Sequence, residues 1–304
     1  MIIVVDIKRK NLQGRMRNKR MRILILIFVL FTNQIYGQSD HSENRDQAQL
    51  ELLLKKCAEY CERVKSIALL YVCQEEIQEK TNFYRIADTL RTTPYGITEI
   101  VPGESLKLKR TRTSSYLYDY QLMKKEEKLH EQRILLEKNK RKKHIENAEL
   151  EVRFNAAYLI YGSVGFLSQY WQNDFEYKII GQEDIDKIPA AIIKATPKPN
   201  NKENRNFAEI WINEKDGSIL QIEWEPESII DYKGKNIELP VGNFKTVVVW
   251  KVTYGVEKNG VRFPGRQHIQ EFLVSESGKR YLRNEIITSF NDYKFFIVET
   301  EIKY

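Results

Sequence analysis

The sequence predicts an α+β fold that consists mainly of antiparallel β-strands. The clearest element is a hairpin in "FAEIWINEKDGSILQIEW" (207–224), where apolar alternation stops at an Asp-Gly turn and resumes after it. Similar alternating segments follow from residue 244 onward, and the turns expected between them are Lys258-Asn259-Gly260, Glu276-Ser277-Gly278 and Asn291-Asp292. Apolar residues at three- and four-residue spacing over 42–67 predict one N-terminal helix. We count about nine to eleven strands, and a sheet of that size is large enough to curl.

The first 37 residues have the composition of a secretory signal. Basic residues in "RMRNKRMR" precede the apolar run Ile23–Phe31 and a polar stretch that ends at Gly37. This run is far shorter than the roughly 20 residues that a membrane-spanning helix needs. We therefore expect cleavage near Gly37 and a periplasmic or secreted product of residues 38–304, folded as a single domain. An uncleaved signal anchor is the alternative.

The positive charge of the chain belongs to this leader. The whole chain carries 49 Lys and Arg against 42 Asp and Glu, and residues 1–37 hold eight of the basic residues and one acidic residue. Residues 38–304 are therefore neutral by formal count. A nucleic-acid partner would require a basic patch on the folded domain, so we expect none.

The predicted helix carries two of the three cysteines of the chain. Its apolar face consists of Leu50, Leu53, Leu54, Cys57, Cys61 and Val64, and charged residues occupy the other side. A bond between Cys57 and Cys61 would constrain almost nothing, because both lie on one helix face a single turn apart. A disulfide between Cys61 and Cys73 would close a loop worth roughly 3 kcal/mol. We predict this pair, with Cys57 left free.

The segment after the helix changes from apolar alternation to polar composition. We favour a strand over 68–79, because the residues alternate between two sets, Tyr71, Cys73, Glu75 and Ile77 in one and Val72, Gln74 and Glu76 in the other. A helical continuation is the alternative. Residues 80–110 are polar and contain prolines and glycines, and we expect a loop or an irregular edge that forms an insertion. Two long strands with a reversal near Lys125–Lys128 are expected over 113–138.

Two further segments stand out by their charge. The run "KNKRKKHIEN" (138–147) is so rich in basic residues that we expect an exposed, mobile turn, with an anionic-surface contact as the alternative. Residues 154–173, "FNAAYLIYGSVGFLSQYWQN", contain no charged residue. This segment is too polar on average for a transmembrane helix. We expect a helix, broken at Gly162 or Gly165, that its own protein covers on several sides.

Several stretches resemble proteins of the LolA/LolB/LppX-like group, the periplasmic carriers of lipids and lipoproteins. The hairpin "EIWINEKDGSILQIEW" is similar to their strand–turn–strand, in which an aromatic strand precedes an Asp- and Gly-containing turn. "GVRFPGRQHIQEF", "ITSFNDYKFFIVETEI" and "LYVCQEEI" resemble further strands of secreted LolA-like bacterial proteins. This chain departs from carrier LolA in its greater length, in the insertion at 80–110 and in its cysteines.

The resemblance implies a strongly curved, unclosed β-barrel whose concave side is filled by an N-terminal helix and a plug helix at 154–173. Such a sheet requires apolar residues on both faces, which agrees with the hairpin, where Phe207 and Trp211 point away from the other apolar residues. The residues expected to line a ligand cavity are Ile210, Ile212, Leu220, Ile222 and Trp224 of the hairpin, with Tyr158, Leu167 and Trp171 of the plug. An ordinary filled core is the alternative.

No catalytic constellation is evident in the sequence. It contains no nucleophile elbow, phosphate-binding loop or dinucleotide fingerprint, and His41, His130, His144 and His268 are scattered. We therefore expect a protein without enzymatic activity, cofactor or metal. The leading hypothesis is a binding protein for a lipid, an acyl chain or a lipoprotein, with at most transient membrane contact. The alternative is an interaction or sensor module that holds a protein segment on the same curved sheet.

Overall fold

The structure is a computed structural model that describes residues 46–67, 70–92, 94–96, 98–125, 128–154, 159–199, 207–229 and 244–296. The chain divides into a unit of residues 1–49 and a compact unit of residues 50–304, and the sheet belongs to the second. The signal-peptide prediction for residues 1–37 therefore lies outside the described part of the chain.

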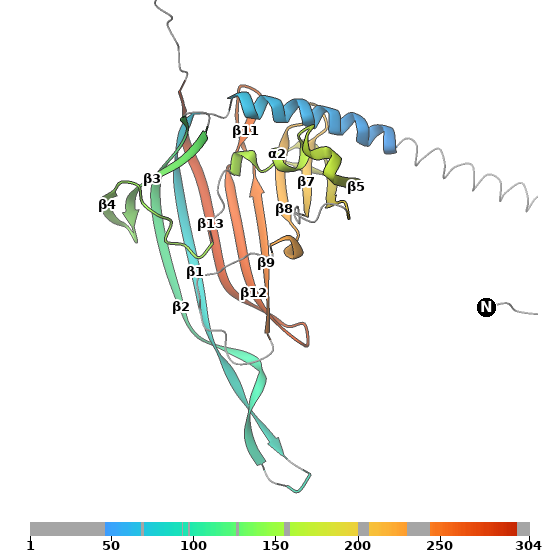
Figure 1. Cartoon of the computed structure of the whole chain (residues 1–304). Helices are drawn as coiled ribbons and strands as arrows, with labels where there is room; N and C mark the ends of the chain where they lie inside the picture. Colours follow the sequence, from blue (N-terminus) through green and yellow to red (C-terminus); the bar gives the residue numbers. More distant parts are fainter. Residues whose placement is uncertain are drawn as a thin grey trace, which may run out of the picture. The chain divides into compact units, whose positions relative to one another are not determined.

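The second unit is built on one antiparallel sheet of eleven strands, in the order β4-β3-β2-β1-β13-β12-β9-β8-β7-β6-β5 (Figure 1). The strands are β1 (Tyr71–Thr92), β2 (Thr98–Lys125), β3 (Lys128–Lys138), β4 (Arg141–Ile145), β5 (Phe175–Ile185), β6 (Ile188–Pro197), β7 (Ala208–Asn213), β8 (Ile219–Trp224), β9 (Phe244–Thr253), β12 (Arg266–Ser275) and β13 (Arg280–Phe295). A separate pair is formed by β10 (Val256–Lys258) and β11 (Val261–Phe263).

The predicted fold class is confirmed. The two end strands of the sheet, β4 and β5, do not pair with each other, so the described sheet curves without closing into a barrel. The C-terminal strand β13 lies between β1 and β12 and thereby joins the strands that precede the plug to those that follow it. The expected strand over 68–79 is part of β1, and the reversal near Lys125–Lys128 separates β2 from β3.

The predicted N-terminal helix is also present, and residues 46–67 are helical. Its buried residues include Leu50, Leu53, Cys57, Cys61 and Val64, which are five of the six expected apolar-face positions, while Leu54 is half-buried. Tyr60 adds to this face and is 1% exposed. The helical spacing of apolar residues therefore identified the packed face correctly.

The prediction of a loop over 80–110 is wrong. These residues form the distal halves of β1 and β2, which pair continuously as far as Thr92 and Thr98 apart from two register shifts. Beyond the pairing of Thr81 with Asn284, β1 has no further partner on β13, and the two strands continue as a two-stranded ribbon (Figure 1). Many side chains of this ribbon are exposed. Its sequence therefore lacks the apolar alternation by which strands are usually recognised.

Two smaller expectations also need correction. The charged run 138–147 contains a tight turn at Asn139 and Lys140, both with positive φ, followed by the exposed edge strand β4. Charged side chains are typical of an edge strand, because they discourage pairing with other chains. A turn was expected at Asn291-Asp292, but β13 continues through both residues. Asp292, with φ of 52°, lies at a bulge opposite β1, so its backbone produces a local irregularity instead of a reversal.

The uncharged segment is a chain of short turns, not one interrupted helix. It contains a 3-10 turn at Leu159–Tyr161, the four-residue helix α2 (Val164–Leu167) and a second 3-10 turn at Trp171–Asp174. We call residues 159–174 the plug segment. In the described part of the chain, no helix combines the length and the apolar character needed to cross a membrane.

Candidate functional site

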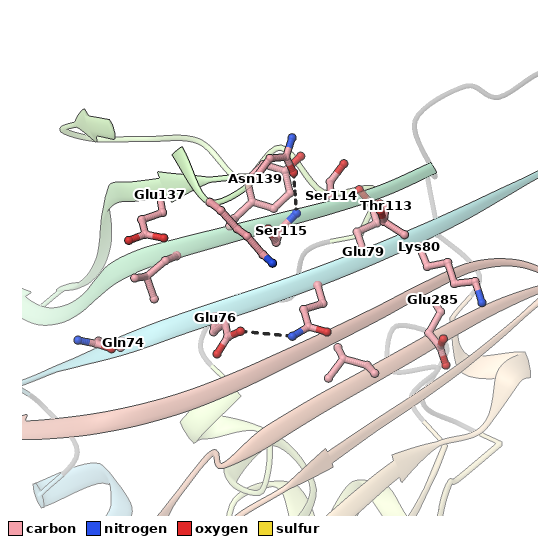
Figure 2. Close-up of a pocket in the computed structure, with 15 residues that line it drawn as sticks. Gln74, Glu76, Glu79, Lys80, Thr113, Ser114, Ser115, Glu137, Asn139 and Glu285 are labelled. Atoms are coloured by element: carbon pink, nitrogen blue, oxygen red, sulfur yellow. Dashed lines mark hydrogen bonds between the residues drawn. The ribbon is translucent and has the colours of Figure 1, made fainter. Parts of the chain in front are cut away.

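A cavity in the described part of the chain lies away from the predicted residues. It is a groove of about 850 Å³ across β1, β2 and β13, with the turn between β3 and β4 at one side (Figure 2). Most of the residues that line it are polar or charged, and both signs of charge occur, with Glu76, Lys80, Lys140 and Glu285 among them. Asn139 accepts a hydrogen bond from the backbone N–H of Ser115 at 3.0 Å, which fixes the turn against β2.

A smaller cavity of about 280 Å³ lies near Met123, His130 and Arg133. Neither of these two cavities is lined by any of the eight residues predicted to form a ligand site. In the described part of the chain, no cluster of three or more His, Cys, Asp or Glu residues could hold a metal ion.

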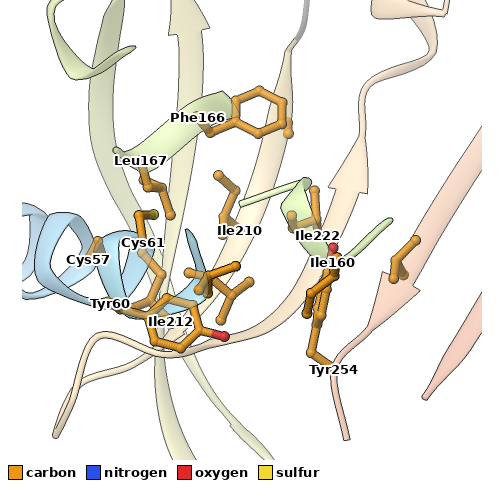
Figure 3. Packing of buried hydrophobic residues seen from close by; sticks show 14 of the residues in the cluster. Cys57, Tyr60, Cys61, Ile160, Phe166, Leu167, Ile210, Ile212, Ile222 and Tyr254 are labelled. Carbon is orange, nitrogen blue, oxygen red and sulfur yellow. The ribbon is translucent and has the colours of Figure 1, made fainter. Parts of the chain in front are cut away.

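Six of the eight predicted cavity residues lie in, or pack against, one buried apolar core. Leu167, Ile210, Ile212 and Ile222 are completely buried, and Trp224 is 7% exposed. Together with residues of the helix they form one cluster, and the half-buried Trp171 packs against it. Figure 3 places the plug side chains Ile160, Phe166 and Leu167 among Cys57, Tyr60 and Cys61 of the helix and Ile210, Ile212 and Ile222 of the sheet. We call this side of the sheet the inner face.

Two of the eight predicted residues do not join this cluster in the structure as described. Leu220 packs with Ala190 and Trp211 in a separate cluster. A bulge explains its position, because Trp211 pairs with Gln221 while the next residue, Ile212, pairs with Ile219, so that Leu220 is left over. The other residue, Tyr158, lies outside the described part of the chain.

Two tyrosine side chains, one just after β9 and one on β5, attach the plug segment by its backbone. The Tyr254 hydroxyl donates a hydrogen bond to the carbonyl oxygen of Leu159 at 2.9 Å. The Tyr177 hydroxyl of β5 donates to the carbonyl oxygen of Phe166. Burial raises the pKa of both phenols well above its usual range, so both remain protonated donors at ordinary pH.

The N-terminal helix attaches the plug segment from the other side. The Gln172 side-chain amide donates to the carbonyl oxygens of Leu54 and Leu167, both at 2.8 Å. The Cys61 thiol lies 3.8 Å from the carbonyl oxygen of Ser163, within the range of a weak sulfur hydrogen bond. The plug segment therefore lies between two partners that each hold it through a few side-chain contacts.

All three cysteines are buried and free in the structure. Burial raises the pKa of Cys61 to about 12 and that of Cys73 well above its usual range. Because the thiolate is the reactive form, these thiols react slowly once the protein has folded. We therefore expect any Cys61–Cys73 bond to form before the helix packs on the sheet. Non-reducing peptide mapping of exported protein tests the pairing, and three free thiols would contradict it.

Buried charges lie on the inner face beside the apolar core. Arg133 of β3 donates two hydrogen bonds to Glu75 of β1, at 2.6 Å and 3.3 Å. Burial raises the pKa of Glu75, although Arg133 favours its charged form. On β12, Glu271 is completely buried and contacts two arginines, Arg153 at 2.8 Å and Arg283. The sequence expectations identified none of these ion pairs, because each joins residues far apart in the sequence.

Comparisons with known proteins find structural likeness without sequence likeness. No family model and no curated protein matches the chain. A DUF1329 family protein from Desulfovibrio piger is 8% identical, with a TM-score of 0.32, over 84% of this chain and 95% of that one. A LolA superfamily protein from Nitrosomonas europaea is 12% identical, with a TM-score of 0.30, over 81% and 93%. An outer-membrane lipoprotein-sorting protein domain from Vibrio parahaemolyticus is 10% identical, with a TM-score of 0.31, over 82% and 95%.

Proposed function

We propose that the protein is an exported, non-enzymatic binding protein that holds a lipid, an acyl chain or a lipoprotein between the plug segment and the inner face of the sheet. The observation that carries this proposal is the construction of the plug segment. The plug segment covers an apolar part of the inner face and consists of short turns. Hydrogen bonds from Tyr254, Tyr177 and Gln172 attach it.

The energetics of this arrangement favour an exchange of plug for cargo. A hydrogen bond of this kind contributes roughly 0.5–1.5 kcal/mol net, so the bonds from Tyr254, Tyr177 and Gln172 are a small part of the cost of releasing the plug segment, and the exposure of its apolar side chains is the larger part. Once the apolar side chains of the plug segment have left, another apolar group must cover the inner face in their place. An acyl chain supplies one, because each buried methylene contributes about 0.8 kcal/mol. The cargo would therefore replace the plug side chains in the core, and no empty cavity is needed in the unloaded protein.

A charge placed on the plug segment tests this exchange. We expect Leu167→Glu to lower the free energy of unfolding modestly and to alter the binding of a fluorescent fatty-acid probe, because the plug segment can swing outward. Ile222→Glu should reduce both strongly, since Ile222 is completely buried on a central strand and a buried unpaired charge is costly. Urea unfolding and probe titration measure the two quantities.

The matched control is Tyr170→Glu, because Tyr170 belongs to the same segment and is 74% exposed. This variant should keep wild-type stability and probe binding. The proposal would be contradicted if the wild type bound no probe and Leu167→Glu simply unfolded it. Mass spectrometry of lipids that co-purify with the protein would then identify no cargo.

A second candidate function is the recognition of a protein segment without lipid. The observation that favours it is the polar groove of about 850 Å³ on β1, β2 and β13, which offers exposed carboxylate, ammonium and amide groups to a peptide. This function would leave the inner face permanently filled. It becomes the better account if the fatty-acid probe does not bind and no lipid co-purifies.

A further inference from the structure

The two-stranded ribbon at the distal ends of β1 and β2 has two different faces. Cross-strand pairing places Tyr84 opposite Leu108 and Ile86 opposite Leu106, which makes one face apolar. Three of these residues, Tyr84, Ile86 and Leu106, pack with Leu273, Tyr281 and Phe244 of the sheet. The Tyr84 hydroxyl also donates a hydrogen bond to the carbonyl oxygen of Leu282 at 2.8 Å. This face is therefore the one by which the ribbon is held.

The other face of the ribbon is basic. The same register places Arg85 opposite Lys107, Phe83 opposite Arg110 and Thr81 opposite Arg112. Side chains directly opposite each other share a face, so four cations from two strands lie together on the side turned away from the apolar contacts. All four are exposed. We call Arg85, Lys107, Arg110 and Arg112 the basic face.

The basic face has no compensating ion pair among the described residues. In the described residues, none of its four cations forms an ion pair, although the Arg110 guanidinium lies 4.4 Å from the centre of the Phe83 ring. Like charges directly opposite each other, as in Arg85 and Lys107, destabilise a strand pair. An anionic partner would remove this repulsion. The basic face is a local excess of positive charge, because residues 38–304 taken together are neutral by formal count.

We propose that the basic face docks the protein on a membrane surface that carries anionic lipid headgroups. One further feature fits a bilayer surface better than an acidic protein. Tyr95, at the turn that ends the same ribbon, is 90% exposed. Exposed aromatic side chains on a cationic segment are typical of the membrane–water interface.

Docking would bring the proposed cargo site to a membrane, where cargo could be exchanged. This use of the docking rests on the proposed function, but the docking itself does not. Attraction of this kind is reversible, because each cation near an anionic surface strengthens binding only about fivefold, and salt screens the interaction. The ribbon also lies apart from the plug segment in the sheet order, since β1 and β2 belong to the part next to β3 and β4. The protein could therefore remain docked while the plug segment opens.

Vesicle binding tests the proposal. The full-length mature protein is mixed with vesicles of phosphatidylcholine alone or of phosphatidylcholine with phosphatidylglycerol, and co-sedimentation is measured at low and at physiological salt. We expect binding only to the anionic vesicles, with weaker binding at the higher salt. The variant Arg85→Gln/Lys107→Gln/Arg112→Gln should bind them on the order of a hundredfold more weakly. Its substitutions are at exposed positions and remove the repulsion between Arg85 and Lys107, so its stability should be no lower than that of the wild type.

A matched control removes the same charge from another exposed strand. Arg141→Gln/Lys142→Gln/Lys143→Gln changes three exposed cations of β4, and this variant should keep wild-type vesicle binding. Equal losses in the two triple variants, or wild-type protein that ignores anionic vesicles, would overturn the proposal. Both triple variants should bind the fatty-acid probe as the wild type does. A failure of probe binding in the wild type would sink the proposed cargo function alone and leave the vesicle result unaffected.

Discussion

Replacing Gly217 by alanine is expected to lower the free energy of unfolding by about 2–5 kcal/mol, because two penalties add at this position. Gly217 ends the turn between β7 and β8 with φ of 71°, a conformation that side chains disfavour. A Cβ atom there would also lie 2.5 Å from the backbone carbonyl carbon of Lys56 and 2.8 Å from the backbone nitrogen of Cys57. These atoms belong to the helix backbone and cannot move aside separately.

Gly278→Ala is the matched control for Gly217→Ala. Gly278 has φ of 82°, but no atom lies within 4 Å of the position that its Cβ would take. This variant therefore carries only the conformational penalty, about 1–2 kcal/mol. Urea unfolding of the two variants separates the cost of the backbone strain from the cost of the contact with the helix. Equal losses would mean that the helix does not pack on the hairpin turn as closely as described.

This turn illustrates what could be predicted from the sequence. Asp216-Gly217 was recognised as a reversal because its chemistry is local: Asp216 accepts a hydrogen bond from the backbone N–H of Ser218 at 2.9 Å. The contact with Lys56 could not be predicted, because it depends on where the helix packs. The Lys56 ammonium donates a hydrogen bond to the carbonyl oxygen of Glu214 at 2.6 Å, across 158 positions of sequence. At this turn, local signals therefore identified the element but not the helix that packs against it.

At the candidate site, too, local sequence patterns predicted some features and missed others. Apolar alternation correctly assigned Ile210, Ile212 and Ile222 to one face of the hairpin. It failed for Leu220, because a bulge changes the face of a residue without changing the sequence pattern. The residues that hold the plug segment were missed altogether. Tyr254 reaches Leu159 from 95 positions away, and no spacing rule connects a tyrosine hydroxyl with a distant carbonyl oxygen.

The buried carboxylate of Glu271 shows why such long-range pairs matter for stability. Glu271 is completely buried, and the side chains of its partners Arg153 and Arg283 are 6% and 7% exposed. A bulge in the pairing of β12 with β13 follows Glu271 and leaves both Arg283 and Asn284 buried. Arg153 belongs to the segment between β4 and the plug segment, where its backbone N–H also donates to Glu79 at 3.1 Å. One carboxylate thus joins that segment to two neighbouring strands.

Glu271→Gln should lower the free energy of unfolding by about 3–5 kcal/mol, because it leaves two buried guanidinium groups without their carboxylate. The control Glu76→Gln removes an exposed carboxylate of β1 and should change stability by no more than about 0.5 kcal/mol. Replacing the whole group, as in Glu271→Leu/Arg153→Met/Arg283→Met, should recover much of the loss, since it removes the carboxylate and both guanidinium groups together. Urea unfolding of the three variants measures these differences. If Glu271→Gln were as stable as Glu76→Gln, the inner face would have to be open to water at this point, and the segment that carries Arg153 would not cover it.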